Sequence, residues 1–379
     1  MKILVLSAHT ASLFWFRMNM MQAFLENGHT VYAVGSEAES EWSERFAARN
    51  ITYRQIPVSR NGTNPLNDLK TYRAICALLR EIQPDKIFAY QAKAIVYGAM
   101  AAKQCGISEF YTLIAGLGSV FRGSGLKTDL VRTVLTAQYR LACRQSKAVI
   151  FQNNDDRAEL VRRKIVQTEK TKIINGSGVD LVQFTEQPFP QQIRFLFIGR
   201  LIKDKGVVEY LEACRRLKTV HPEAECMLIG PFDSNPSALQ PEELSAYTAE
   251  GTVEYFGEQS DVRPYLGKTA VFVLPSYFEG TPKTVLEAMA TGRAVITTDA
   301  PGCRETVTDG VNGLLVETKN AEAVAKAMQT LYENPKQCAA FGAAGRKIAE
   351  EKYDVNKVNA TIMDIMSIEK ERKKENVLV

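Results

Sequence analysis

Several features are missing from this sequence of 379 residues, and each absence argues against a class of protein. Its apolar runs, such as "ILVLSA" and "VFVLPS", are short, and none reaches the roughly 18–20 residues of a membrane-spanning helix. The N-terminus has no long apolar region with a cleavage site, so we expect no signal peptide. The seven cysteines contain no CxxC pair, which favours reduced thiols in a cytoplasmic protein over disulfides or a zinc site.

Two sequence motifs are missing as well. The Gly-rich stretch 115–125 follows a predicted strand, but Phe121 stands where G-x-G-x-x-G requires its third glycine, which argues against a nicotinamide-dependent dehydrogenase. The chain also contains no D-x-D, which is the usual metal-binding signature in one of the two common folds of nucleotide-sugar transferases. We therefore expect neither a metal nor a cofactor.

Charge is distributed unevenly along the chain. Residues 1–180 contain 24 Lys and Arg and 15 Asp and Glu, a balance of +9, whereas the remaining residues carry −5. A positive half indicates an anionic partner, such as nucleic acid, anionic lipid headgroups or a phosphorylated substrate. Nucleic-acid binding would need a groove-reading motif or a series of stacking aromatics, and the sequence has neither.

Short apolar segments alternate with helical segments of about 10–15 residues, which indicates βαβ units and parallel sheets. The pattern restarts after the Pro- and Gln-rich stretch 185–193, which we interpret as a linker. We therefore predict an α/β protein with two doubly wound, Rossmann-like domains, 1–184 and 185–379, and the last helix is a candidate to pack back on the first. Ligands of such sheets bind beyond the carboxyl ends of the strands, so we expect the site in the cleft between the domains.

The stretch "FEGTPKTVLEAM" places Glu279 and Glu287 eight positions apart, between a strand and a helix. We expect Pro282 at the first helical position and Thr281 as the N-cap. A helix N-terminus favours a phosphate, so Glu279 makes sense only if it faces neutral hydroxyl groups beside that phosphate. Two hydroxyl-bearing groups flanking a diphosphate describe a nucleotide-sugar. The alternative is that Glu287 is an exposed helical glutamate at a chance spacing.

A second element, "GRLIKDKG", places Arg200 and Lys205 after another strand of the same half. Two cations there could stabilise a departing diphosphate in place of a metal ion. The alternative is a pair of solvated charges in an ordinary loop. Their position at the same sheet edge as the two glutamates favours the functional interpretation.

These two elements, together with "GVDLVQF" (178–184), resemble the retaining glycosyltransferases of family 4, which have the GT-B fold. The resemblance covers essentially the whole chain. It implies a nucleotide-sugar donor held mainly by the C-terminal domain, an acceptor held mainly by the N-terminal one, retention at the anomeric carbon and no metal. It also implies that Arg200 and Lys205 bind the diphosphate, Glu279 the transferred sugar and Glu287 the ribose. The turn and helix start, Gly280, Thr281, Pro282 and Lys283, would bind the phosphates.

The N-terminal half is similar to a bacterial branch of this family, on the segments "SAHTASLFWFRMNM", "YQAKAIVYGAMAAK" and "LIAGLGSVFRG". That branch builds capsule, O-antigen and protein-linked glycans on undecaprenyl diphosphate, and includes transfer of N-acetylgalactosamine to undecaprenyl-diphosphate diacetylbacillosamine. The resemblance implies UDP-N-acetylgalactosamine as the first candidate donor. UDP-glucose or UDP-galactose transfer in capsule or O-antigen synthesis is the alternative, and a UDP-sugar epimerase of the same architecture is the nearest enzymatic rival.

The chain departs from the wider family in two loops: the first reads "AHTAS" without a Gly-Gly pair, and "LIAGLGS" lacks the usual catalytic histidine. His9 in the first loop is a candidate substitute, although a lone histidine is more often structural. If the Gly-rich stretch 115–125 lines the acceptor side, we expect Lys93 and Arg122 to bind the acceptor's diphosphate; the alternative is that this stretch is a flexible surface turn. Further candidates on the acceptor side are Ser12, Arg17 and Gly116.

The segment "TDLVRTVLTAQYRLACRQS" predicts a long helix, and Arg140, Arg144 and Lys147 follow at a spacing that would place them on one face, with apolar residues opposite. Such a helix could rest on anionic headgroups. The alternative is a packed helix with a solvated face. A polyprenyl-linked acceptor favours the former, so we expect a cytoplasmic protein bound peripherally to the inner face of the cytoplasmic membrane.

Overall fold

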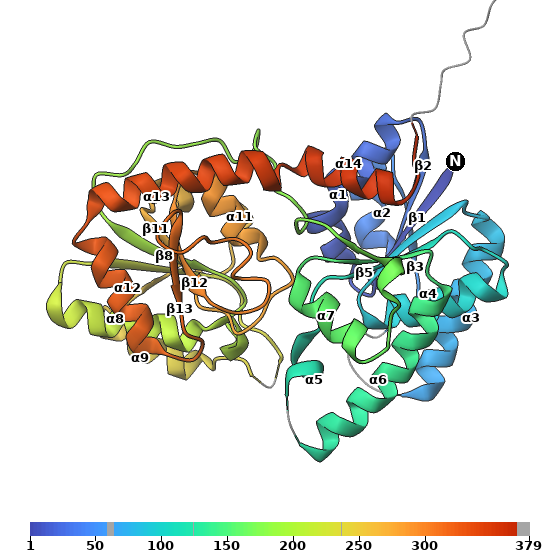
Figure 1. Ribbon diagram of the computed structural model, residues 1–379, viewed down its shortest axis with the longest axis horizontal. Coiled ribbons are helices and arrows are strands. Elements are labelled where there is room, and N and C mark those ends of the chain that lie inside the picture. Colours follow the sequence, from blue (N-terminus) through green and yellow to red (C-terminus); the bar gives the residue numbers. More distant parts are fainter. Residues whose placement is uncertain (59–63, 124, 236, 370–379) are drawn as a thin grey trace, which may run out of the picture. The chain divides into compact units, whose positions relative to one another are not determined.

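The computed structural model of the chain describes residues 1–58, 64–123, 125–235 and 237–369. The chain divides into two compact units, one formed by Met1–Ser177 with the segment from Val358 onward, the other by Gly178–Lys357 (Figure 1). Both units are α/β structures built around a parallel sheet, as the alternation of apolar and helical segments predicts.

The first unit contains a seven-stranded sheet in the order β3-β2-β1-β4-β5-β6-β7, and all neighbouring strands are parallel. The strands are β1 (Lys2–Leu6), β2 (Thr30–Gly35), β3 (Thr52–Gln55), β4 (Lys86–Tyr90), β5 (Phe110–Ile114), β6 (Ala148–Phe151) and β7 (Thr171–Ile173). The helices are α1 (Thr10–Glu26), α2 (Glu39–Ala47), α3 (Pro65–Ile82), α4 (Ala92–Gln104), α5 (Gly118–Arg122), α6 (Leu126–Gln145), α7 (Asn154–Arg162), the 3₁₀ turn η1 (Thr168–Lys170) and most of α14 (Val355–Ile365).

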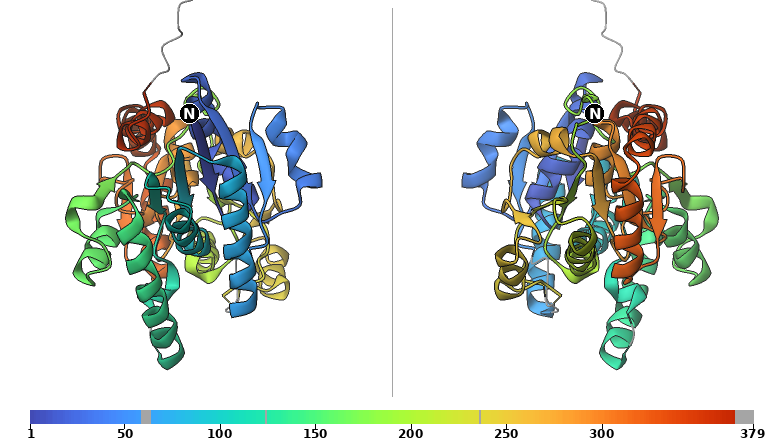
Figure 2. Two further views of the ribbon diagram at one scale, coloured as in Figure 1. Left: turned by 90° about the vertical axis from the view of Figure 1, so that its right-hand side faces the viewer. Right: turned by 90° about the vertical axis from the view of Figure 1, so that its left-hand side faces the viewer.

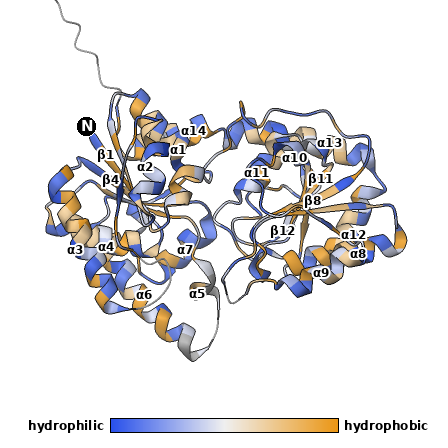
Figure 3. Ribbon diagram, turned by 180° about the vertical axis from the view of Figure 1, so that it is seen from behind, coloured by the Kyte–Doolittle hydropathy of each residue, from blue (hydrophilic) through white to orange (hydrophobic). Residues whose placement is uncertain are grey.

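Two apolar cores lie on the two faces of this sheet. Leu4 and Leu6 of β1 pack with residues of α3, α4 and α6, whereas Ile3 and Val5 pack with residues of α1, α2 and α14. Successive strand residues point to opposite faces, so a strand covered on both sides reads as one continuous apolar run. Figure 2 shows helices on both sides of the sheet, and Figure 3 shows the hydrophobic residues along the strands.

The second unit contains a six-stranded parallel sheet in the order β10-β9-β8-β11-β12-β13. The strands are β8 (Arg194–Ile198), β9 (Glu225–Ile229), β10 (Glu254–Tyr255), β11 (Val271–Leu274), β12 (Ala294–Thr298) and β13 (Gly313–Val316). The helices are α8 (Val207–Val220), α9 (Pro241–Ala249), α10 (Arg263–Lys268), α11 (Lys283–Ala290), α12 (Ala321–Tyr332) and α13 (Pro335–Ile348), with the turns η2 (Lys203–Lys205) and η3 (Ala349–Tyr353). The strands and the inner faces of these helices share one apolar core.

Each sheet has one point at which the strand order reverses. In the first sheet β1 lies between β2 and β4, and in the second sheet β8 lies between β9 and β11. The loops that leave such a pair of strands turn to opposite faces and leave a crevice at their carboxyl ends, where α/β proteins bind ligands. The topology therefore selects the loops after β1 and β4, and after β8 and β11.

The boundary between the units lies between Ser177 and Gly178, where we expected it at 184/185. Val179 already belongs to the second unit, because its N–H donates to the carbonyl of Tyr353 at 2.8 Å and its own carbonyl accepts from Val355 N–H at 3.0 Å. The Pro- and Gln-rich stretch that resembles a linker packs on the second unit, since Arg293 donates to the carbonyl of Pro188 at 3.0 Å.

The end of the chain returns to the first unit. Val358, Ile362 and Met366 join the apolar core beneath α1 and α2, and Figure 1 shows α14 beside these helices. His29 also lies within hydrogen-bond distance of the carbonyl oxygen of Glu369, at 3.0 Å. The second unit is therefore an insertion between two segments of the first.

Candidate active site

The second sheet brings its predicted site residues together at the reversal between β8 and β11. The loop after β8 is held against the loop after β11 by main-chain contacts: Tyr277 N–H donates to the carbonyl of Asp204 at 2.9 Å, and Ser276 Oγ donates to it at 3.1 Å. Gly206, with a φ of 73°, lies so close that a Cβ atom would stand 2.1 Å from the carbonyl oxygen of Pro275. The two loops therefore form one rigid edge.

Lys205 and Glu279 form a charged pair across these two loops. The Nζ atom of Lys205 donates a hydrogen bond to Oε1 of Glu279, and the Glu279 side chain is only 12% exposed. The main chain of Glu279 is held in place as well, because its N–H donates to the carbonyl of Pro301 at 2.9 Å. A charge-assisted bond of this kind orients both groups. Lys205 and Glu279 therefore present one positive and one negative group side by side.

Arg200 lies on the same edge. It pairs with Asp233, which the sequence did not indicate as its partner. Its Nη1 atom donates to Oδ2 of Asp233 at 2.8 Å, in the loop after β9. The Arg200 side chain remains 40% exposed, so it can still reach a ligand. Asp233 lies 33 positions further along the chain, and only the adjacency of β8 and β9 brings it close.

Glu287 lies on the buried side of α11 and is 7% exposed. Burial raises the pKa of its carboxyl group, and Lys283, whose Nζ lies 3.7 Å from Oε1, opposes that increase only in part. Glu287 is therefore not the solvated charge of the alternative interpretation. A buried carboxylate that pairs with a single cation is costly unless a ligand supplies further hydrogen-bond donors.

Replacing Glu287 with glutamine should stabilise the ligand-free protein at neutral pH. Its carboxyl pKa is higher in the folded chain than in the unfolded chain. Ionisation therefore destabilises the folded protein as the pH rises from the pKa of the unfolded chain to that of the folded chain. We expect Tm of the variant to exceed that of the wild type by about 2–4 °C at pH 7.5, with the two converging below about pH 4. Thermal melts across pH test this, with the exposed Glu350→Gln as control; a lower Tm at pH 7.5 would contradict it.

The helix start after Glu279 differs in one detail from the prediction. Helix α11 begins at Lys283, and Pro282 rather than Thr281 occupies the N-cap position. Proline has no side-chain oxygen, so it cannot cap the helix as a threonine would. Gly280 and Thr281 lie between Glu279 and this helix start, where the dipole of α11 adds positive potential.

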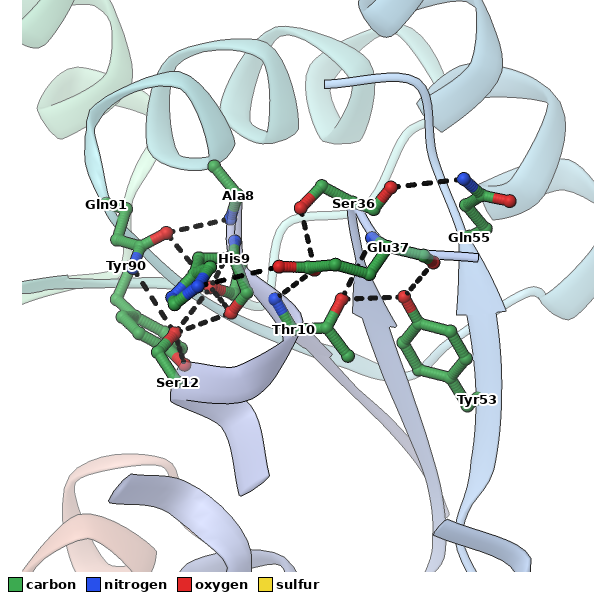
Figure 4. A network of polar contacts seen from close by, with 11 residues as sticks. Ala8, His9, Thr10, Ser12, Ser36, Glu37, Tyr53, Gln55, Tyr90 and Gln91 are labelled. Atoms are coloured by element: carbon green, nitrogen blue, oxygen red, sulfur yellow. Dashed lines mark hydrogen bonds and ion pairs between the residues drawn. The ribbon is translucent and has the colours of Figure 1, made fainter. Parts of the chain in front are cut away.

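The first sheet has a second polar network, at the reversal between β1 and β4 (Figure 4). The amide of Gln91 ties the two loops together, because its Oε1 accepts from Ser7 Oγ and from Ala8 N–H, while its Nε2 donates to Ser12 Oγ. Gln91 adopts a φ of 70°, a strained conformation for a residue with a side chain. Such strain persists only where the surrounding contacts fix it.

The hydroxyl of Ser12 is fully occupied by this network. It donates to the carbonyl of His9 at 2.6 Å and lies within hydrogen-bond distance of Tyr90 and Gln91 as well. A hydroxyl group makes about three hydrogen bonds. Ser12 therefore shapes the loop, and its predicted contact with substrate would require one of these bonds to break.

His9 lies at the carboxyl end of β1 next to a carboxylate that the sequence did not indicate. Its Nε2 atom is 3.5 Å from Oε1 of Glu37, which follows β2. The other oxygen of Glu37 accepts from Thr10 N–H at 2.5 Å and from Ser36 Oγ at 2.8 Å. These hydrogen bonds and His9 outweigh partial burial and keep the pKa of Glu37 below its usual value. Figure 4 shows His9 and Glu37 facing each other.

The remaining acceptor-side candidates have different surroundings. Lys93 is held by Asp68, with Nζ and Oδ1 2.8 Å apart, so its role as a phosphate ligand stays a prediction. Gly116 lies in the exposed loop after β5 with a φ of 119°, and the side chain of Arg122 lies outside the described residues. Arg17 is buried on α1 and stacks on Tyr90.

The predicted basic helix ends before the last of its three expected cations. Helix α6 ends at Gln145, so Lys147 lies beyond it, and its Nζ pairs with Glu109. Arg140 donates to the carbonyls of Arg163 and Lys164. Leu130 and Leu141 are more than 60% exposed, at 68% and 63%. An unusual amount of apolar surface therefore accompanies the basic residues of this helix.

A cavity of about 710 Å³ lies beside the C-terminal end of α6, at the opposite edge of the first sheet from His9 and Gln91. Several cations line it, but they cap main-chain carbonyls; Lys170, for example, donates to the carbonyl of Ser146 at 2.8 Å. Its position away from both strand reversals separates it from the site residues.

Two further properties bear on the site. Among the described residues no cluster of three or more His, Cys, Asp or Glu side chains could hold a metal ion. The described helices include none with the length and apolar character that crossing a membrane requires.

Comparison with known proteins identifies the family. The family described as "Glycosyl transferases group 1" matches residues 182–348, and "Glycosyl transferase 4-like" matches residues 2–153. The N,N'-diacetylbacillosaminyl-diphospho-undecaprenol alpha-1,3-N-acetylgalactosaminyltransferase of Campylobacter jejuni is 31% identical over 350 residues, or 89% of this chain and 90% of that protein. The chain belongs to the family 4 glycosyltransferases. The prediction of a GT-B glycosyltransferase of glycan biosynthesis is thereby confirmed.

Two other proteins resemble this glycosyltransferase less closely. The UDP-Gal:alpha-D-GlcNAc-diphosphoundecaprenol alpha-1,3-galactosyltransferase of Escherichia coli is 22% identical over 72% of this chain and 73% of that protein. The crystal structure of Anabaena Alr3699/HepE in complex with UDP has a TM-score of 0.76 and 18% identity, covering 97% of this chain and 100% of that one. At that identity the likeness concerns the GT-B fold.

Proposed function

We propose that this glycosyltransferase moves a hexose or N-acetylhexosamine from a UDP-sugar to a sugar linked to undecaprenyl diphosphate, with retention of anomeric configuration and without a metal. The single observation that carries the proposal is the reversal between β8 and β11, where Lys205 holds Glu279 and the buried Glu287 lies on the following helix. The C. jejuni and E. coli relatives, named for transfer to diphospho-undecaprenol sugars, support the acceptor class. UDP-N-acetylgalactosamine is the first candidate donor.

In this proposal the donor diphosphate binds at Arg200, Lys205 and the start of α11. As the bond from the sugar's anomeric carbon to the phosphate oxygen breaks, negative charge develops on the phosphate and positive charge on the sugar ring. The two cations and the helix dipole stabilise the former, and the carboxylate of Glu279 stabilises the latter. Glu287 accepts hydrogen bonds from the ribose hydroxyls.

The acceptor hydroxyl attacks from the face that the phosphate leaves, and its proton passes to an oxygen of the departing UDP. The bond formed joins the acceptor oxygen to the anomeric carbon, so a disaccharide on the lipid and free UDP are the two products. His9, oriented by Glu37, is the candidate group of the first unit to contact this hydroxyl. No covalent intermediate on the enzyme is required.

The test is to incubate the purified protein with UDP-N-acetylgalactosamine, UDP-N-acetylglucosamine, UDP-glucose or UDP-galactose and undecaprenyl-diphosphate monosaccharides. Mass spectrometry should detect a disaccharide on the lipid, and NMR should show an axial anomeric bond retained from the donor. Conversion of one UDP-sugar into its epimer, without a lipid-linked product, would support the epimerase alternative and contradict transfer.

We further propose that α6 places the enzyme on the inner face of the cytoplasmic membrane. Leu130, Val134 and Leu141 share one side of this helix and are 51–68% exposed, and the first half of the chain carries +9. Exposed apolar residues beside cations are typical of helices that lie in anionic headgroups. For the double variant Leu130→Glu, Leu141→Glu, we expect a large decrease in the fraction of protein that sediments with vesicles containing phosphatidylglycerol. Unchanged sedimentation would contradict the proposal.

A further inference from the structure

Arg17 is a buried cation for which the described chain supplies no counter-charge. It lies on α1 and is 3% exposed, and its guanidinium carbon is 5.2 Å from the centre of the Tyr90 ring. Its Nε atom is fully buried without a hydrogen-bond partner. Its two terminal nitrogens make no hydrogen bond within the described residues, so the tip of the guanidinium has no partner in that part of the chain.

The groups around Arg17 are already engaged with one another. Glu37, the acid of the adjacent network, receives Thr10 N–H and Ser36 Oγ at one oxygen and faces His9 with the other. Its carboxylate is therefore not available to the guanidinium. The Tyr90 hydroxyl, in turn, lies 2.8 Å from Ser12 Oγ.

Burial without an ion pair destabilises the charged form of Arg17. Desolvation lowers the pKa of the guanidinium, and Tyr90 counteracts this only in part. Removing such a charge from water costs more than one cation–π contact returns. An anion from a ligand would offset this cost, and a guanidinium binds a phosphate through two parallel hydrogen bonds.

The position of Arg17 indicates which ligand brings that anion. Tyr90 is the last residue of β4, and α1 follows β1, so the guanidinium lies at the reversal of the first sheet. The donor site already has its own cations, Arg200 and Lys205, on the second sheet. We propose that Arg17 binds a phosphate group of the diphosphate of the lipid-linked acceptor. The identity of the ligand rests on the proposed function, whereas the anion site does not.

The experiment replaces Arg17 with methionine, which keeps the apolar contact with Tyr90 but removes the charge. Arg293 provides a matched control: it is also buried, at 0% exposure, but its terminal nitrogens donate to the carbonyls of Pro188 and Gly267. We expect Arg17→Met to raise Tm of the ligand-free protein by about 2–4 °C and Arg293→Met to lower it. A merely structural role predicts a lower Tm for both variants and would overturn the proposal.

Binding is measured with two probes that need no turnover, geranyl diphosphate and UDP, by isothermal titration. Arg17→Met should weaken the affinity for geranyl diphosphate by at least about 30-fold, whereas the affinity for UDP should change by less than about 3-fold. Arg17→Lys, which keeps the charge but not the paired hydrogen bonds, should lie between. An equal loss for both probes would assign the anion to the donor, and no loss for either would remove the site; both overturn the proposal.

Transfer assays then separate this inference from the proposed function. With a lipid-diphosphate acceptor, Arg17→Met should raise KM for the acceptor at least about 30-fold with little change in kcat, and a neutral alkyl glycoside acceptor should show no such rise. If the wild type transfers no sugar but geranyl diphosphate binding still depends on Arg17, the proposed function fails and the anion site stands. An equal KM rise with both acceptors would overturn the role in phosphate binding.

Discussion

Replacing Glu279 with glutamine is expected to lower kcat for sugar transfer by about 10²–10³-fold while UDP affinity changes by less than about 3-fold. The amide is the same size and can still accept the hydrogen bond from Lys205, so the position of that cation is retained. What disappears is the negative charge that faces the positive charge developing on the sugar ring. The effect should therefore appear in the chemical step and not in binding of the nucleotide.

The measurement is steady-state kinetics with the donor and acceptor found in the assay, together with UDP titration. Glu350→Gln is a matched control, because Glu350 also pairs with a cation, Arg346, in the second unit but is exposed. The control should retain the wild-type kcat. Normal turnover by Glu279→Gln would show that the sugar site has been assigned to the wrong carboxylate.

The sequence was informative where a site residue lies close to its element boundary. Arg200, Lys205 and Glu279 lie in the loops that follow apolar strands, so their place at the carboxyl edge of the sheet could be predicted from order alone. Glu287 was harder, because an eight-position spacing does not distinguish a buried carboxylate from a solvated one. Only the packing of α11 decides it.

Partners from other loops could not be predicted from the sequence. Asp233 reaches Arg200 because β8 and β9 are adjacent, and Glu37 reaches His9 because β1 and β2 are adjacent. The strand order that creates these pairs is a tertiary property. The same holds for Gln91, because composition does not indicate its positive φ; its only sequence signal is an amide side chain directly after a strand.

Short and polar elements were also missed. The sequence did not indicate α2, β3, α5, α7, β7, α9, α10 or β13, because these have few residues or little apolar periodicity. Proline and glutamine between 185 and 193 suggested a linker, whereas the main chain there is bound by Arg293 and Thr291. The composition of this stretch suggested a flexible linker, but its packing against the second unit places it inside that domain.

Both sheets use their strand reversal in the same way. At each one, a charged side chain of one loop is held by a residue of a neighbouring loop: Lys205 with Glu279 in the second unit, and His9 with Glu37 in the first. The difference lies in the charge that is buried beside each reversal. The second unit buries a carboxylate, Glu287, which pairs with Lys283 and is suited to hydroxyl groups. The first unit buries a cation, Arg17, whose Nε atom has no hydrogen-bond partner and which is suited to a phosphate.

Gly302 provides a test of how strictly Glu279 must be positioned. It follows β12 with a φ of 82°, and a Cβ atom there would lie 2.2 Å from the carbonyl oxygen of Glu279 and 2.6 Å from that of Gly280. Because these are main-chain atoms, no side-chain rotation can relieve the clash. Gly302→Ala should therefore displace the Glu279–Gly280 segment and lower kcat by about 10²-fold, since a shift of about 1 Å is enough for such a loss.

Gly310→Ala separates this displacement from backbone strain. Gly310 has a similar φ of 70°, but a Cβ atom there would meet nothing within 4 Å. Both alanines should cost about 1–2 kcal/mol of stability through the left-handed backbone, whereas only Gly302→Ala should also impair transfer. Thermal melts and kcat of the two variants decide the matter. Equal activity of the two variants would mean that the carboxylate tolerates the displacement, and the catalytic role of Glu279 would then have to be abandoned.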